Sequence, residues 1–325
     1  MRGFYVLVRR ELMAYFLGPS AYLFLAGFLA VQGYWCCYLL DIARDPVRGG
    51  LDNFFEGYVS GFLPVFMLLM VPVITMRLLA EEKRAGTLET LATAPIGDAT
   101  IVLAKFSSAF LFYVFLFAMT FSHVATYIDH IVTPTWKILG WTPPYGFLGA
   151  MLAWGCLASA AWALGRFSDR DAVWGMVATA AFAACVALLI LYVKKAPEGM
   201  PDITKIAAGY VGALLLGATL LSVGLLFSAL AQNQVTAAIL SGSGLGVYLL
   251  LSALAGQSRA KIPWTENTRW AEKTWGDVLG YVSMFQRPQA FNAGQVQLDS
   301  LLLALSVIAF FLFATVKAVE SRKWR

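Results

Sequence analysis

Charged residues are scarce in this sequence. Asp, Glu, Lys and Arg make up 13% of its 325 residues, whereas soluble domains carry about 25%. The net charge is only +5, and no basic run is interleaved with aromatic residues, so nothing indicates nucleic-acid binding. Hydrophobic residues make up 59% of the sequence. They gather in runs of roughly 20, the length that crosses a ~30 Å hydrocarbon core. The sequence therefore predicts several membrane spans.

Histidine and cysteine are also few. The two histidines, His123 and His130, lie near the end of one apolar run, and the four cysteines lie within apolar runs. This pattern predicts neither a metal site nor a disulfide framework. There is no G-x-x-x-x-G-K-[ST] phosphate loop, which excludes a P-loop ATPase in this sequence, and no G-x-S-x-G nucleophile motif. We predict no catalytic residues and no cofactor bound to this chain.

Eight apolar runs are predicted to form transmembrane helices, because a helix satisfies its backbone polar groups internally, as lipid requires. They are Phe16–Leu40, Tyr58–Ala80, Ile101–Ser122, Tyr145–Phe167, Ala172–Val193, Ile206–Ala231, Val235–Ala255 and Ser300–Val319. Four of them follow a side chain suited to N-capping: Asp98, Asp171, Asn233 and Asp299. The expected fold is an all-α, polytopic helical bundle that forms a single membrane domain.

An even number of spans places both termini on one side of the membrane. Basic residues gather at both termini and after the second and fourth runs, which predicts that these parts are cytoplasmic. Lys194 and Lys195 lie on the opposite side and weaken this pattern. The segment 256–299 is too polar to span, and its aromatic residues indicate short interfacial helices on the outer face.

The most informative segment, Met76–Pro95, joins the second and third predicted spans and reads MRLLAEEKRAGTLETLATAP. Gly86 can adopt the left-handed conformation that ends a helix. Thr87 can cap a second helix, with Glu89 in its first turn and an apolar face that starts at Leu88. This pattern predicts a short amphipathic cytoplasmic helix joined to two membrane helices. A plain hairpin with a solvated charge cluster explains the same pattern equally well.

The order Arg, AEEKR-x-GTLE and Pro resembles the intracellular loop of type 2 ABC exporter (ABC-2-type) permeases, most closely the gliding-motility-type permease group. In that family this loop, here 81–97, forms a coupling helix that sits in a cleft of the ATPase subunit. The resemblance implies contact or hinge roles toward an ATPase for Arg77, Glu81, Glu82, Lys83, Arg84, Gly86, Thr87, Leu88 and Glu89.

Three other stretches resemble the same family. Residues 1–15 look like its N-terminal connecting helix, and Phe227–Val235 looks like its second cytoplasmic turn. Residues 281–299 resemble its outer segment before the last span. The positions that the resemblance singles out are Arg9, Arg10 and Glu11 in the connecting helix and Gln232, Asn233 and Gln234 in the turn. One departure is the extra hairpin predicted at 145–193, because such permeases usually have six core spans.

The resemblance implies a permease subunit of an ABC exporter in the cytoplasmic (inner) membrane. Its expected partners are two cytoplasmic ATPase subunits that bind ATP and Mg, a second permease subunit in a homo- or heterodimer, and membrane lipids. Two other functions fit the composition: a membrane-embedded enzyme that modifies lipids or glycans, and a membrane anchor of a secretion or motility machine. The sequence does not indicate which substrate would be exported.

Small residues at a spacing of four predict close helix packing in two places. These are Gly57-x-x-x-Gly61 and Gly242-x-x-x-Gly246. The second pair belongs to the run SGSGLG, which follows no predicted strand, so we do not interpret it as a dinucleotide-binding loop.

Overall fold

A computed structural model describes much of the chain. It covers residues 2–17, 19–44, 63–87, 97–120, 123, 203–255 and 298–321. Within these ranges the regular structure is helical and contains no strand, which confirms the all-α prediction for this part of the chain. The chain divides into two compact units. Unit 1 comprises residues 1–24, 52–114 and 204–325, and unit 2 comprises residues 25–51 and 115–203.

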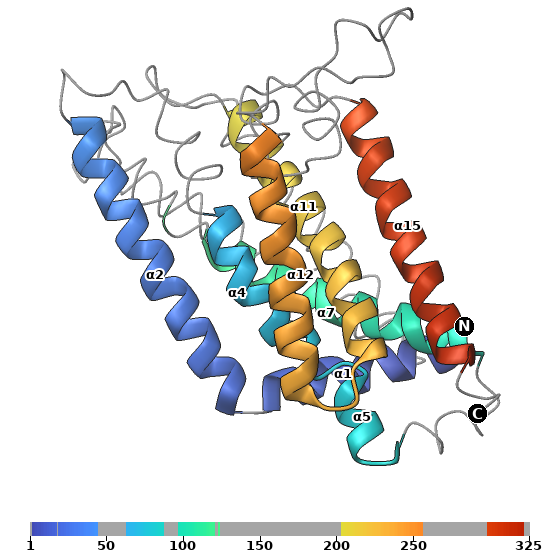
Figure 1. Ribbon diagram of the computed structural model, residues 1–325. Coiled ribbons are helices and arrows are strands. Elements are labelled where there is room, and N and C mark those ends of the chain that lie inside the picture. Colours follow the sequence, from blue (N-terminus) through green and yellow to red (C-terminus); the bar gives the residue numbers. More distant parts are fainter. Residues whose placement is uncertain are drawn as a thin grey trace, which may run out of the picture. The chain divides into compact units, whose positions relative to one another are not determined.

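The N-terminal region forms two helices separated at residue 18 (Figure 1). Helix α1 covers Arg2–Leu17 and helix α2 covers Pro19–Arg44. The predicted connecting helix therefore extends two residues further than residue 15, and the predicted span that begins at Phe16 begins at Pro19 instead. Proline favours this position, because its fixed φ suits the first turn of a helix and its missing N–H is not needed there.

The second predicted span ends earlier than expected. Helix α4 covers Leu63–Thr75, a turn covers residues 76–79, and the five-residue helix α5 covers Ala80–Arg84. The prediction of one helix that continues to Ala80 was wrong. At this point the backbone N–H groups of Leu79 and Ala80 donate to a side chain of another helix, Ser228, rather than to the preceding turn.

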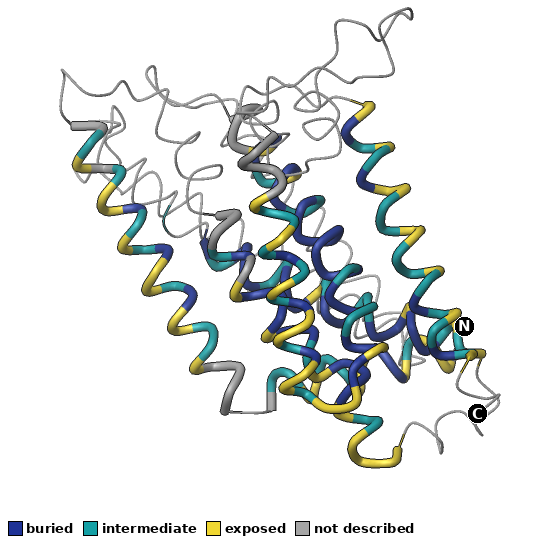
Figure 2. The backbone as a smooth tube through the Cα atoms, in the orientation of Figure 1, coloured by how far each residue is buried: buried dark blue, intermediate teal, exposed yellow. Residues whose placement is uncertain are grey.

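Four longer helices follow: α7 (Asp98–Met119), α11 (Ile203–Leu230), α12 (Gln234–Ala255) and α15 (Leu298–Glu320). Their bounds lie within three residues of the predicted spans. Among the described residues, three helices are long and apolar enough to cross a membrane: Asp98–Met119, Ala207–Leu230 and Leu298–Glu320. Shorter apolar stretches lie in α2 and α12. Figure 2 shows that α11 is largely buried, whereas most residues of α15 are exposed or half-buried.

Glycines on α11 and α12 allow the helices of unit 1 to pack closely. A Cβ atom added at Gly217 would lie 2.2 Å from Cζ of Tyr113, and one at Gly224 would lie 2.6 Å from Oγ1 of Thr75. One at Gly244 would lie 2.7 Å from the ring of Phe227. These three positions leave room for no side chain, so glycine sets the distance between the helices there.

The predicted glycine pair on α12 has a looser environment. A Cβ atom at Gly242 would meet Pro72 of α4 at an ordinary 3.8 Å, and no described atom lies within 4 Å of one at Gly246. Helices α12 and α4 are in contact, so the expected kind of packing exists at Gly242. At Gly246 the described structure has no close approach, and Gly244 takes that role instead.

In unit 2, aromatic and polar side chains join α2 to the end of α7. The rings of Phe28 and Phe117 lie 5.9 Å apart, and the thiol of Cys36 donates to the carbonyl oxygen of His123 at 3.8 Å. His123 also lies against Gly33, 3.2 Å from its would-be Cβ atom. His123 thus packs against α2 at this point.

Several predictions concern residues outside the described ranges. They are the spans Tyr145–Phe167 and Ala172–Val193 with the hairpin 145–193, the outer segment 256–299, the pair Gly57 and Gly61, and the residues Leu88, Glu89, His130 and Asp171. The total of eight spans and the coupling helix after Thr87 therefore stay predictions.

Candidate functional site

The chain after α4, residues 76–87, is rich in charged residues, and we call it the charged segment. Its helix, α5, ends next to a residue with a left-handed backbone conformation. Helix α5 has Glu81 and Glu82 in its first turn and Lys83 and Arg84 in its last turn, which matches the polarity of the helix dipole. Its C-cap is Ala85, and the next residue, Gly86, has φ +69°. This confirms the predicted helix end, because only glycine adopts that conformation without steric cost.

A cluster of four charged side chains joins this segment to two other helices; we call it the ion cluster. Its members are Arg10 and Glu11 of α1, Glu82 of α5 and Lys105 of α7. The Lys105 Nζ atom lies 3.0 Å from Oε1 of Glu82 and 3.3 Å from Oε1 of Glu11. Nη2 of Arg10 lies 2.7 Å from the same oxygen of Glu11 and 3.0 Å from that of Glu82. Two cations therefore neutralise two carboxylates.

Burial differs sharply within the ion cluster. The Lys105 side chain is 1% exposed and the two glutamates are 14–15% exposed, whereas Arg10 is 54% exposed. The hydrogen bond to Glu11 is the main cause that raises the pKa of Arg10 above its ordinary value. Because Lys105 is buried, its charge requires both carboxylates. The cluster therefore holds α1, α5 and α7 in one arrangement.

Apolar packing supports the same arrangement. Leu7 and Val8 of α1 are buried against Ile101 and Ala104 of α7, with Leu12 packed beside them. These residues of α1 recur at helical spacing on one face, while Arg9 and Arg10 point to more exposed positions. Helix α1 therefore lies with its apolar face on the start of α7 and its charged face toward the ion cluster.

A second set of contacts joins the charged segment to α11. The hydroxyl oxygen of Ser228 accepts hydrogen bonds from the backbone N–H groups of Leu79 and Ala80, at 3.2 Å each. The ammonium group of Lys83 donates to the carbonyl oxygens of Ala229 and Ala231, the latter at 3.1 Å. Lys83 thus places a positive charge at the C-terminal end of α11, where the helix dipole favours it.

The turn between α11 and α12 contains the three residues that the sequence singled out. Asn233 caps α12: its side-chain oxygen accepts from the N–H of Thr236 at 2.8 Å, and its own N–H donates to the Thr236 hydroxyl at 3.3 Å. This reciprocal pair confirms the predicted N-cap. Gln232 is exposed and Gln234 is half-buried. Figure 1 shows this turn at the same end of unit 1 as α5 and α1.

The other predicted N-caps differ in position. Asp98 and Asp299 lie inside the first turns of α7 and α15 rather than before them. For α7, the carbonyl oxygen of Gly97 accepts from the N–H groups of Thr100 and Ile101, so Gly97 occupies the position before the helix. A carboxylate in the first turn is still favoured by the helix dipole.

Some residues of the charged segment take no part in the contacts described above and form its outer surface. Arg77, Glu81, Arg84, Gly86 and Thr87 are exposed, whereas Glu82 and Lys83 are partly buried by their contacts. The hydroxyl group of Thr87 donates to the carbonyl oxygen of Glu82 at 3.3 Å. Of the nine positions predicted to face an ATPase, Glu82 and Lys83 hold the segment in place and five are exposed. The other two, Leu88 and Glu89, lie outside the described ranges.

The sequence did not reveal two residues of this site. Lys105 lies within an apolar run, and Ser228 lies near the end of another. A lysine flanked by apolar residues is a signal in itself, since a charge inside a membrane helix requires a partner. Nothing in the sequence around Ser228 indicates that its hydroxyl accepts two N–H groups from a distant turn.

We expect Ser228→Ala to destabilise the protein by about 1–3 kcal/mol, because it leaves two buried N–H groups without their acceptor. The free energy of unfolding can be measured by SDS titration in mixed micelles. Ser243→Ala on α12 is the matched control, since that hydroxyl is exposed and donates only to the Leu240 carbonyl of its own helix. Equal effects of the two substitutions would contradict the role of Ser228.

This geometry suits a mechanical role. Among the described residues, no group of three His, Cys, Asp or Glu side chains could hold a metal ion. Ion pairs and hydrogen bonds join the charged segment to three other helices, α1, α7 and α11. Part of the chain matches a known protein family. Residues 20–179 match the ABC-2 family transporter proteins.

The ABC-2 match covers just under half of the chain and includes α2, α4, the charged segment and α7. Members of that family are membrane components of ABC transporters rather than enzymes. Within the ion cluster, Glu82 and Lys105 lie inside the matched region, whereas Arg10 and Glu11 precede it. No curated protein matches the chain significantly.

Proposed function

We propose that this protein is the permease subunit of an ABC exporter and that the charged segment couples it to a separate ATPase. The ABC-2 match supports the transporter class. The observation that carries the coupling role is the double attachment of α5. Glu82 joins it to α1 and α7, while Lys83 and Ser228 join it to α11. A force on the exposed side of α5 therefore reaches three other helices.

In this proposal two cytoplasmic ATPase subunits bind ATP and Mg, and the permease pairs with a second permease subunit. Closure of the ATPases would push the charged segment, and the rigid attachment would tilt the helices between two access states. The sequence resemblance supports a place in the gliding-motility-type group, in the inner membrane with both termini cytoplasmic. The residues proposed to meet the ATPase are those with exposed side chains, Glu81 and Arg84 above all.

Two of the residues proposed for coupling, Glu82 and Arg84, have different surroundings. Glu82 is paired inside the protein, so a charge reversal there would disturb folding as well as any contact with an ATPase. Arg84 is exposed and belongs to neither the ion cluster nor the contacts with α11. Arg84 is therefore the better position at which to test coupling.

We expect Arg84→Glu to lower ATP hydrolysis of the purified permease–ATPase complex about tenfold, the size of a typical coupling free energy. The chain would be tagged, expressed with its ATPase, and purified from membranes as a complex. Lys317→Glu is the matched control, because Lys317 is also an exposed cation, at the end of α15, and its ion pair with Glu320 is exposed. Such a pair contributes little to stability.

Normal membrane insertion with reduced hydrolysis in Arg84→Glu, and full activity in Lys317→Glu, would support the proposal. Unchanged hydrolysis in Arg84→Glu would contradict the coupling role of this surface. Failure of any ATPase to purify with the wild-type chain would contradict the permease function itself.

A further inference from the structure

A pocket of about 260 Å³ lies beside the ion cluster, within unit 1. It is formed by α1, the first turns of α2, the end of α4 with the following turn, and α7. The lining residues are Glu11, Ala14, Tyr15, Phe24, Val73, Ile74, Met76, Arg77, Leu78, Glu81 and Phe112. The pocket shares Glu11 with the ion cluster, whereas none of its apolar residues takes part in the coupling contacts described above.

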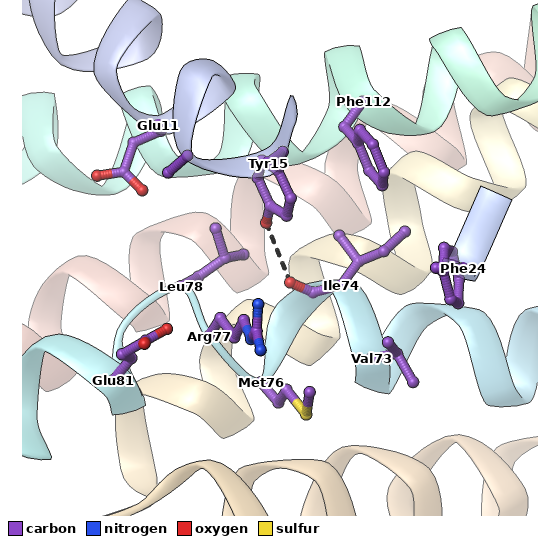
Figure 3. Close-up of a pocket in the computed structure, with 11 residues that line it drawn as sticks. Glu11, Tyr15, Phe24, Val73, Ile74, Met76, Arg77, Leu78, Glu81 and Phe112 are labelled. Atoms are coloured by element: carbon purple, nitrogen blue, oxygen red, sulfur yellow. Dashed lines mark hydrogen bonds between the residues drawn. The ribbon is translucent and has the colours of Figure 1, made fainter. Parts of the chain in front are cut away.

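The pocket has a polar end and an apolar end. Figure 3 shows Glu11 and Glu81 toward one end, Arg77 next to Tyr15 in the middle, and Phe24, Val73 and Phe112 toward the other end. The apolar end belongs to membrane-type helices, and Val73 is 41% exposed. A bound molecule with a polar head and an apolar tail would therefore place its tail along α4 and its head at the charged segment.

Tyr15 divides the two ends and is fixed in place. Its hydroxyl group donates to the carbonyl oxygen of Ile74 at 3.1 Å, and its ring stacks on Phe112 with centroids 4.8 Å apart. Burial raises the pKa of Tyr15 well above its ordinary value, and the negative charge of Glu11 adds to this rise. The pocket wall is thus preformed rather than shaped by a ligand.

The charges at the polar end select the kind of headgroup. An anionic headgroup would meet Arg77 but also two carboxylates, and a purely cationic one would meet the guanidinium group. A zwitterionic headgroup matches both signs: its phosphate can accept hydrogen bonds from Arg77 and its ammonium group can donate to Glu81. Glu11 is already held by Arg10 and Lys105, so Glu81, which is exposed, is the carboxylate for the ammonium group.

We propose that this pocket binds a membrane phospholipid with a primary-amine headgroup, that is, a phosphatidylethanolamine. A primary ammonium group donates hydrogen bonds to a carboxylate, whereas the quaternary group of a phosphatidylcholine cannot. The cavity holds the headgroup and the first part of one acyl chain, and the rest of the lipid lies in the bilayer beside Val73. The site needs no ATPase, so it can be tested on the permease chain alone.

The test uses the full chain in detergent with phosphatidylethanolamine, phosphatidylcholine or phosphatidylglycerol added at equal concentration. Native mass spectrometry counts bound lipids, and thermal unfolding measures stabilisation. We expect phosphatidylethanolamine to bind about tenfold more tightly than the other two, as a charge-assisted hydrogen bond implies. Glu81→Gln should remove that preference, because it removes the carboxylate for the ammonium group. Arg77→Gln should weaken the binding of all three lipids, because each carries a phosphate, and Val73→Trp should abolish binding by filling the apolar end.

Arg84→Gln is the matched control, because Arg84 is an exposed arginine of the same segment that does not line the pocket. It should keep the full preference. Equal binding of all three lipids by the wild-type chain, or an unchanged preference in Glu81→Gln, would overturn the proposal. If a variant fails to fold, the site can be tested by crosslinking a photoactivatable phosphatidylethanolamine to the wild-type chain. Crosslinks within residues 11–24 and 73–81 support the site, and crosslinks only elsewhere overturn it.

Discussion

Lys105→Met is expected to destabilise the protein by about 3–5 kcal/mol, because it removes the cation from a buried ion cluster and leaves the carboxylates underneutralised. Both Glu11 and Glu82 lie within 3.3 Å of the Lys105 ammonium group, and only Arg10 would remain to balance them. Methionine replaces the lysine chain as far as Cε with an unbranched apolar side chain, so packing changes little. The measurement is the free energy of unfolding by SDS titration in mixed micelles.

The charge balance of the cluster offers a sharper version of this experiment. The double variant Lys105→Met/Glu82→Gln retains only Arg10 and Glu11, which already pair at 2.7 Å. It should recover roughly half of the lost stability, since the remaining charges cancel. Lys317→Met, at an exposed lysine, should change stability by less than about 1 kcal/mol. Additive losses in the double variant would show that packing, and not charge, makes Lys105 necessary.

Gly217→Ala is expected to cost about 3 kcal/mol, because its new Cβ atom would lie 2.2 Å from Cζ and 2.5 Å from the hydroxyl oxygen of Tyr113. Tyr113 is fully buried and donates to the carbonyl oxygen of Ala213 at 2.8 Å. The ring would have to move, and that hydrogen bond would be lost with it. Unfolding in the same mixed micelles measures the effect.

Gly246→Ala is the matched control for this prediction. It also replaces a glycine in a membrane helix, but no described atom lies within 4 Å of its new Cβ atom. It should leave stability unchanged or raise it by up to about 1 kcal/mol, through the better helix propensity of alanine. Similar losses at both positions would contradict the role of Tyr113 and indicate a general intolerance of side chains at these glycines.

Helix positions were largely predictable from the sequence, because apolar runs in lipid can only be helical. The bounds of α7, α11, α12 and α15 follow from such runs alone. The end of α4 at Thr75 was not predictable, since it depends on an acceptor, Ser228, contributed by a distant helix. A local stretch of sequence predicts hydrogen bonds between neighbouring residues well. It does not predict which distant side chain will accept a hydrogen bond in place of a neighbouring carbonyl group.

The candidate site was predictable in part for the same reason. The charged segment and the end of α5 at Gly86 were recognisable, because capping depends on neighbouring residues. The different surroundings of Glu81 and Glu82 were not predictable, because nothing in the sequence distinguishes two adjacent glutamates until the ion-pair partners of Glu82 are known. Likewise, glycine spacing indicated Gly242 and Gly246, but a close approach depends on the facing side chain, such as Phe227 opposite Gly244.

The buried position of Lys105 has a consequence for biosynthesis. Arg10, Glu11 and Glu82 all precede Lys105 in the sequence, so a chain that emerges from the ribosome exposes both carboxylates before their shared cation. Until α7 has been made, Arg10 alone faces two negative charges. Helix α1 can therefore dock in its final position only after the start of α7 has been synthesised. Helix α1 thus settles later than its place in the sequence alone would indicate, and an N-terminal fragment that stops before residue 105 should leave α1 undocked.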